Sequence, residues 1–441
     1  MRSLLGNRNF RRLFAGRLIT NVGDSLYFVA ATWLVYDLTG DPVFSGLAGF
    51  LVMAPQGLQA FAGPLVDRWD LRRLLVGTQV VQGVVILALP VAAHVGMLSV
   101  WVVLTVLPLL ALLNQFVYPA QSAALPRIVD QDELVSANSL FSLAHQGTEL
   151  IATAAAGILI AAIGATALFV VDSVTFAAAA LLFATIHVPP AGSGDATGAA
   201  ASESSAEAPT AVADGGQETP ASEDESLSEE PDGYRESLRE GFGFVRGTIL
   251  VPIVIGGTLV NFVASGATIG VLPAFADSLG GSGAYGALMA AMAGGMLVGA
   301  IVASSLDDLP FGRLTIGSFL LSGVCWMAAI TAAWLPATVV LFALAAVPIG
   351  ASNVLLSSVV QSVVPDRLLG RVSGLLGSAS TAAVPVGALL GGAAASVFGP
   401  AAVMFAGGVS ILLLAVYWLA LPGLRGLGPA SEVETLQAGP A

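Results

Sequence analysis

The sequence predicts an all-α membrane protein with twelve transmembrane helices in two pseudo-symmetric six-helix bundles. Of its 441 residues, 56% are hydrophobic and only 10% are charged, and the apolar residues form twelve long runs. A soluble domain carries charge on about a quarter of its residues. Each run approaches the ~20 residues that a helix needs to cross a hydrocarbon core of about 30 Å. Because backbone groups in lipid must bond to one another, helices are expected.

The runs are separated by short polar connections, apart from one long gap. In chain order they cover 13–38, 43–65, 74–95, 98–122, 138–162, 167–187, 248–275, 284–305, 314–334, 337–362, 372–398 and 400–421. We therefore expect an N-terminal bundle, a linker, a C-terminal bundle and a tail, over 1–189, 190–233, 234–422 and 423–441.

The net charge of −13 is concentrated in the linker. Residues 191–232 hold eleven acidic and no basic residues, and they are rich in Ala, Gly, Ser and Pro. Such a segment cannot bury a core, so we expect a disordered, self-repelling linker.

All sixteen basic residues are arginine, and their positions predict the orientation. With the N-terminus inside, fourteen lie in cytoplasmic segments, Arg17 and Arg246 lie at cytoplasmic helix ends, and none lies outside. Basic residues favour the cytoplasmic side. We therefore expect a multi-pass cell-membrane protein with both termini in the cytoplasm. The first run has no cleavage site after it and should be retained. The lone Cys325 excludes an intrachain disulfide.

A charged segment, GPLVDRWDLRRL, separates the second and third runs. We call it the elbow; its distinctive residues are Gly63, Asp67, Arg68, Arg72 and Arg73. An ordinary positive-inside loop would explain the arginines, but it requires neither the aspartate nor the glycine. The elbow resembles the signature between helices 2 and 3 of major facilitator superfamily transporters, although Trp69 and Asp70 replace the usual small residues.

Other stretches resemble the efflux branch that includes macrolide and siderophore exporters. They are FRRLFAGRLITNVGDSLY, QSAALPRIVDQDELVSANSL, LFVVDSVTF, REGFGFVR and PVGALLGG. The resemblance implies the superfamily fold, a substrate site at the midplane and alternating access. It also implies that the elbow is a conformational latch, in which Asp67 meets helix 11 and pairs with Arg371. The fourth run lacks the arginine that many proton-coupled members carry there, and ATAAAG at 152–157 replaces the Gly-Pro motif common in drug antiporters.

The two halves show a decayed repeat at an offset of about 240 positions. The offset aligns Asp67 with Asp307, Arg73 with Arg313 and Asn21 with Asn261; Asn114 meets Asn353 one position out of step. Asp307 and Arg313 therefore belong to a second copy of the elbow.

Polar residues recur at helical spacing in the first and fourth runs of each half. Because such residues are costly in a bilayer, we expect them to line a central substrate cavity. The alternative is that they bond neighbouring helices together. The expected cavity residues are Arg17, Asn21, Asn114, Tyr118, Gln121, Asn261, Ser265, Thr268, Asn353, Ser357 and Gln361.

Two intramembrane carboxyls are candidate proton carriers. Glu149 lies eleven residues beyond Asn138, hence about 16 Å deep, with His145 one turn away. Asp24 lies about 15 Å deep by the same rise per residue. Alternatively, Asn21 bridges an Arg17–Asp24 pair, or Glu149 stays protonated against His145 while Asp24 or Asp172 carries the proton. Asp172, five residues from the start of its run, is expected to be too shallow.

The remaining signals favour transport over catalysis. Zinc-site spacing, phosphate loops, dinucleotide fingerprints and serine elbows do not occur in the sequence, so we expect neither an enzyme nor a cofactor. Aromatic residues near external helix ends are expected to be interfacial anchors: Trp33, Tyr36, Trp101, Trp334 and Tyr285.

The leading hypothesis is a monomeric secondary active exporter of amphipathic or lipophilic small molecules. Without an ATP motif, protons or another coupling ion would have to supply the energy. The alternatives are an importer or uniporter of a polar metabolite and, in another class, a non-transporting membrane sensor that signals through the linker. No nucleic-acid partner is expected.

Overall fold

The structure is a computed structural model that describes residues 2–58, 66, 69–188 and 248–429. Over these ranges the chain is helical and no strand forms, although Pro310 and Pro429 form an isolated bridge. The all-α prediction is therefore confirmed.

The first half of the chain forms one group of helices. Their bounds are α1 Arg2–Gly6, α2 Arg8–Thr39, α3 Pro42–Met53, a 3₁₀ turn Ala54–Leu58, α5 Leu71–His94, α6 Val100–Asn114, α7 Val117–Ala124, 3₁₀ turns Leu125–Arg127 and Gln131–Glu133, α8 Leu134–Ile163 and α9 Ala165–Ala184.

The second half forms another group. Its bounds are α12 Leu250–Val260, a π-helical segment Asn261–Gly266, α13 Ala267–Gly280, α14 Ser282–Ala303, α15 Phe311–Thr331, α16 Leu335–Val363, α17 Asp366–Phe398, α18 Pro400–Ala420 and α19 Pro422–Arg425.

Ten helical spans in the described residues are long and apolar enough to cross a membrane. Two shorter apolar helices, Pro42–Gln56 and Ala382–Phe398, complete the set. Together they match the twelve predicted runs, and the chain is a multi-pass membrane protein. The expected linker and its boundaries at 190 and 233 lie outside the described residues.

Local sequence signals set several helix ends. The side chain of Asn7 accepts hydrogen bonds from the backbone N–H groups of Asn9 and Phe10 at the start of α2. Asp41 and Asp70 cap α3 and α5 in the same way. Such caps satisfy donors that the first helical turn leaves free. Gly40 ends α2 at a φ of 66°, which a residue without a side chain adopts freely.

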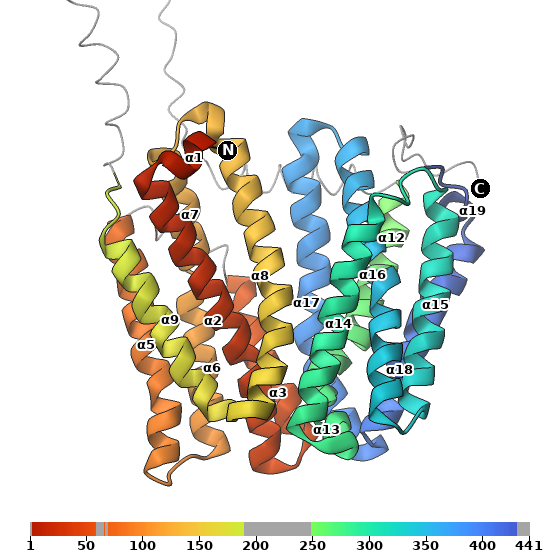
Figure 1. The fold of residues 1–441 in the computed structure, drawn as a ribbon. Helices are drawn as coiled ribbons and strands as arrows, with labels where there is room; N and C mark the ends of the chain where they lie inside the picture. Colours follow the sequence, from red (N-terminus) through yellow and green to blue (C-terminus); the bar gives the residue numbers. More distant parts are fainter. Residues whose placement is uncertain (1, 59–65, 67–68, 189–247, 430–441) are drawn as a thin grey trace, which may run out of the picture.

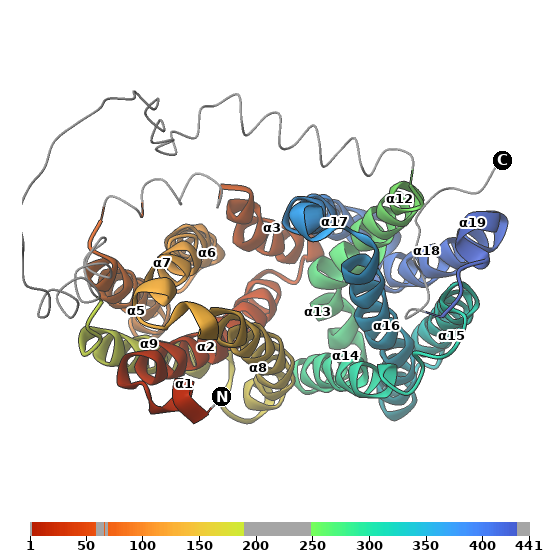
Figure 2. The same cartoon turned by 90° about the horizontal axis from the view of Figure 1, so that it is seen from above.

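The two groups lie side by side, as the view along the bundle shows (Figure 2). In the first half, α9 packs against α2 and α5; in the second, α16 packs against α14 and α15. Helices α1 and α19 lie at the same end of the bundle, which we call the terminal face (Figure 1). The other end is the opposite face.

The halves make tight contacts near the opposite face. There α8 packs against α14, and α3 packs against α17 and α13. Gly157 of α8 lies directly against Gly286 of α14, and a Cβ atom on either would overlap the backbone of the other. Gly46 of α3 lies against the backbone of Ala388 in α17. The structure is therefore closed at this face.

Aromatic residues strengthen this closure, which corrects one expectation. The rings of Trp33 and Tyr285 stack with centroids 5.3 Å apart, and both side chains are buried. The hydroxyl of Tyr36 donates to Asp277 at 3.4 Å. Trp33 and Tyr285 are thus not interfacial anchors, because the halves pair around them, whereas Trp101 and Trp334 remain exposed.

Candidate functional site

A group of polar side chains lies inside the first half, where α2, α6 and α9 approach one another. Arg17 and Asp24 both project from α2, and Arg17 is only 8% exposed. At the end of α6, Asn114 donates its amide hydrogen to Oδ2 of Asp24 at 3.1 Å. Two predicted site helices therefore meet at Asp24.

The charges in this group are not fully paired. Nε and Nη1 of Arg17 and Oδ1 of Asp24 are buried without a hydrogen-bond partner. The two side chains lie within electrostatic range, but they form no direct ion pair in the described part of the chain. No hydrogen bond there links Asn21 to either of them, so the bridged Arg17–Asp24 pair is absent from this state. Buried charges without partners are rare in structural roles.

Asp172 of α9 joins the same group, contrary to the expectation that it would be too shallow. Its side chain is fully buried. Oδ1 accepts a hydrogen bond from Thr175 at 2.9 Å, and Oδ2 has no partner. The carboxylate lies against α2 at Gly23, where a Cβ atom would overlap it. The expectation failed because depth along a helix does not reveal which neighbour the side chain faces.

A buried amide pair beside this group was missed by the sequence analysis. Gln79 and Gln82 of α5 are 0% and 1% exposed. Thr20 donates to Oε1 of Gln79 at 3.1 Å, and Gln79 donates to Oε1 of Gln82 at 3.5 Å. Two amides three residues apart in an apolar run are the signal that could have predicted this pair.

Glu149 and His145 are both exposed on α8, and no hydrogen bond joins them in this structure. Glu149 lies seven residues before the buried Ala156 and therefore on the same side of the helix. Near that position Gly157 meets the second half. Glu149 is thus placed about two turns from the contact, toward the terminal face.

The other expected cavity residues differ in exposure. Gln121 is buried, whereas Tyr118 is 58% exposed. Asn353, Ser357 and Gln361 are all exposed along α16, with Gln361 donating to Ser357 at 3.0 Å.

The predicted cavity residues of the seventh span lie in and beside the π-helical segment. Ser265 donates to Oδ1 of Asn261 at 3.2 Å, and both residues are within that segment. Thr268 is buried and donates to the backbone oxygen of Ala264. Single π turns often occur at functional sites. The sequence indicated one uninterrupted helix here.

Three of the elbow's distinctive residues, Gly63, Asp67 and Arg68, lie outside the described residues, as does the side chain of Arg371. Arg72 is exposed and donates to the backbone oxygen of Ala184, within its own half. Arg73 is exposed, and its backbone N–H is capped by Asp70 at 2.7 Å. In the second copy, Asp307 and Arg313 are exposed.

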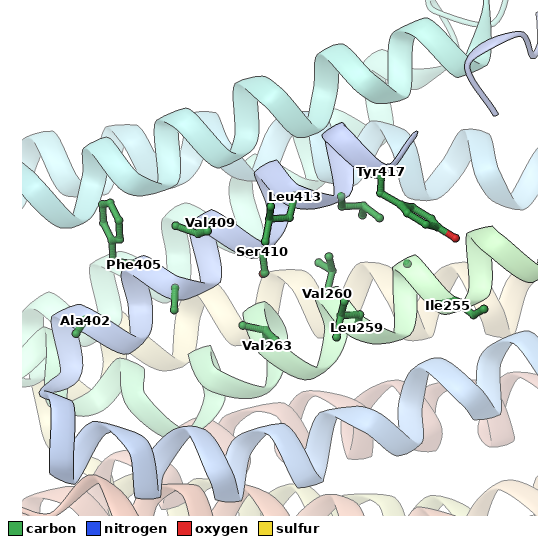
Figure 3. A pocket seen from close by; sticks show the side chains of 13 residues that line it. Ile255, Leu259, Val260, Val263, Ala402, Phe405, Val409, Ser410, Leu413 and Tyr417 are labelled. Carbon is green, nitrogen blue, oxygen red and sulfur yellow. The ribbon is translucent and has the colours of Figure 1, made fainter. Parts of the chain in front are cut away.

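An apolar groove of about 600 Å³ lies apart from the polar group (Figure 3). It is formed by α18 on one side and by α12 and the π-helical segment on the other. Its only polar side chains are those of Ser410 and Tyr417, and Ser410 donates to the backbone of Gly407. The groove therefore suits apolar groups. The described residues contain no group of three or more His, Cys, Asp or Glu that could hold a metal ion.

Two family descriptions match the chain. Residues 3–195 match "Transmembrane secretion effector", and residues 254–437 match "Major Facilitator Superfamily". The chain belongs to the major facilitator superfamily.

Similar proteins include known exporters. An uncharacterised superfamily transporter, YvqJ of Bacillus subtilis, is 23% identical, and the match covers 91% of this chain and 89% of YvqJ. The multidrug efflux pump Tap of Mycolicibacterium fortuitum is 26% identical over 95% of this chain and 97% of Tap. Macrolide efflux protein A of Streptococcus pyogenes is 22% identical over 42% of this chain and 45% of that protein.

Solved structures confirm the fold. A bacterial homologue of the lysosomal transporter Spinster superposes with a TM-score of 0.64 at 14% identity, over 92% of this chain and 95% of that one. A D-xylose–proton symporter superposes with a TM-score of 0.66 at 11% identity, over 97% and 100%. Relatives of this fold thus include both exporters and importers.

Proposed function

We propose that this transporter exports amphipathic or lipophilic small molecules across the cell membrane by alternating access, as a proton-coupled monomer. The similarity to Tap over nearly the whole chain supports export. The fold alone does not decide the direction, because it is shared with a sugar–proton symporter.

One observation carries the proposal. The halves contact each other near the opposite face, while polar side chains of both halves are exposed between that contact and the terminal face, among them Glu149, Tyr118 and Asn353. Polar side chains within a bilayer are stable only where they meet water or one another. The arrangement therefore corresponds to a central path open toward the terminal face.

The arginine distribution supports a cytoplasmic terminal face, with both termini in the cytoplasm. The path would then take its substrate from the cytoplasm or the inner leaflet. Because the described second half buries Ser, Thr and other uncharged polar side chains and no charged ones, we assign an amphipathic rather than a strongly charged substrate.

For coupling, we place Asp24 in the interior and Glu149 with His145 at the opening. We assign the remaining predicted cavity residues to substrate contact and the two elbows to the latch. Opening and closing need only a small free-energy change: a charge-assisted contact is worth about 1.5–3 kcal/mol.

Uptake of ethidium, a lipophilic cation, into inverted membrane vesicles tests the proposal. With an imposed pH gradient and no ATP, an exporter should accumulate the dye. Glu149→Gln is expected to abolish this accumulation and to retain downhill counterflow, because the amide cannot titrate. If accumulation survives, the proton route does not include Glu149.

The same assay separates the alternatives. A uniporter would show counterflow in both vesicle orientations without accumulation, and an importer would accumulate substrate only in right-side-out vesicles. A sensor would bind ligand without transport, and deletion of residues 191–232 would then abolish its output while leaving binding intact.

A further inference from the structure

We propose that Asp172 is a second proton-holding residue of the coupling site: Asp24 and Asp172 hold one proton between them, and Arg17 is their fixed counter-charge. The inference rests on the proposed proton coupling and extends it to a residue on a third helix. It follows from the packing of Asp172 against α2, from polar atoms without hydrogen-bond partners, and from the net charge of the three residues.

The first argument is proximity. Asp172 of α9 presses its carboxylate against α2 at Gly23, the residue immediately before Asp24. The two carboxylates are within electrostatic range of each other, and both act on Tyr27 one turn further along α2. A Cβ atom at position 23 would overlap Oδ1 of Asp172 and Oγ1 of Thr175, so both side chains would have to move. Glycine therefore allows the two acids to lie together.

The second argument is unsatisfied bonding capacity. Asp172 is completely buried, and Arg17 is more than nine-tenths buried. Each keeps polar atoms without a partner, as does Asp24: Oδ2 of Asp172, Oδ1 of Asp24, and Nε and Nη1 of Arg17. Oδ1 of Asp24 and Oδ2 of Asp172 are therefore free acceptors, and each can bind a transported proton without first breaking a hydrogen bond.

The third argument is the charge count. Arg17, Asp24 and Asp172 sum to −1 when both acids are ionised and to zero when one is protonated. Burying an uncompensated charge costs several kcal/mol, so the singly protonated group is favoured. The neighbouring elements do not alter the count. Tyr118 and Tyr27 contribute phenol groups, α5 and α6 contribute the amides Gln79, Gln82 and Asn114, and Glu149 and His145 of α8 are exposed.

The proton step is a simple exchange. When the group communicates with the more acidic side, a proton binds to a carboxylate oxygen and an O–H bond forms. After the halves reorient, the O–H bond breaks and the proton leaves to the other side. The group is then at −1, a state that favours a cationic substrate or the next proton.

Infrared spectroscopy of the purified full-length protein in lipid tests how many protons Asp24 and Asp172 bind at neutral pH. The readout is the carbonyl band of protonated carboxylic acid. All samples carry Glu149→Gln, which removes the exposed intramembrane acid. We expect one acid band in this background, loss of the band in Asp172→Asn and also in Asp24→Asn, and a doubled band in Arg17→Gln. Asp308→Asn, at an exposed carboxylate of the second half, should leave the band unchanged.

Two results would overturn the inference. If Asp24→Asn leaves the band intact while Asp172→Asn abolishes it, Asp172 is a permanently protonated structural residue. If the background protein shows no acid band, both carboxylates are ionised. Should Asp172→Asn fail to fold, the Asp24→Asn and Arg17→Gln samples still decide between these cases.

The spectra do not depend on transport, so they separate this inference from the proposed function. The expected bands without ethidium accumulation would refute the export proposal and retain the shared proton. In the otherwise wild-type chain, Asp172→Asn is also expected to lose pH-driven accumulation and keep counterflow; normal accumulation would contradict a coupling role.

Discussion

The two halves share a fold but differ in what they bury. The described interior of the first half contains Arg17, Asp172 and two glutamines, close to Asp24. In the described second half, the buried polar residues are Thr268, Thr315, Ser318, Ser322, Thr338 and Ser352, and the described acids and arginines are exposed.

This difference indicates a division of labour. A hydroxyl in a helix can donate to its own backbone, as Thr268 does, and then costs little in a bilayer. A carboxylate or a guanidinium cannot, so it is kept where it has a use. Under the proposed coupling, the first half would carry the proton and the second half would supply a mostly neutral surface for the substrate.

The largest effect should come from removing the counter-charge in the first half. Arg17→Met leaves the ionised carboxylate of the Asp24–Asp172 pair without its positive partner, and breaking a buried charge group costs about 3–5 kcal/mol. Thermal unfolding in detergent should show a large decrease in the melting temperature. The decrease should be greater at pH 8 than at pH 5, because protonation at low pH neutralises the acids. Arg313→Met, at an exposed arginine of the second half, is the control and should have little effect.

An intermediate effect is expected where the halves meet. In Gly157→Ala, the new methyl group would overlap the backbone of Gly286. Overpacking costs about 1–3 kcal/mol, which changes the balance of two states by about five- to 150-fold. The opposite face should therefore open. Spin labels at Met97→Cys and Trp334→Cys, with Cys325→Ser, would report a longer distance between the halves.

Gly147→Ala provides the matched control for this change. Gly147 lies on the same helix, and nothing lies within 4 Å of the position its Cβ would occupy. It should leave the distance as in wild type. An equal shift in both variants would mean that helix propensity, not the contact between the halves, is responsible.

The smallest effect should come from the interior of the second half. Ser322 donates to the backbone oxygen of Ala345 at 2.8 Å and is fully buried. Ser322→Ala should cost about 1 kcal/mol, the net worth of such a bond, and should not change the pH dependence of ethidium uptake. A shifted pH profile would show that the second half also takes part in coupling.

The helical spans were predictable because membrane thickness fixes their length and composition. The π-helical segment was not predictable from the apolar pattern, and in it Gly266 lies against Gly387 of α17, a long-range contact that the sequence does not reveal. Similarly, Trp33 and Tyr285 were predicted to lie at the membrane–water interface, because nothing in the sequence shows that their rings stack between the two halves.

The candidate site was predictable in part. Polarity within apolar runs singled out Arg17, Asp24 and Asn114, and the structure brings these three side chains together. It missed Gln79 and Gln82 and undervalued Asp172, because the direction of a side chain depends on the packing of α9 and α5 around α2. The internal repeat also predicted equivalent positions without equivalent surroundings: Asn21 is buried, whereas Asn261 is half-buried within the π segment.

The Gly157–Gly286 contact has a consequence for the speed of the transport cycle. Where two bare backbones touch, no side chains interlock, so the helices can part without any rotamer having to change. What is lost on separation is weak dispersion attraction, about 0.1–0.2 kcal/mol for each atom pair. The glycine pair itself therefore adds little to the kinetic barrier for separating the halves, and the Trp33–Tyr285 stack is the part of the contact that has interlocked side chains.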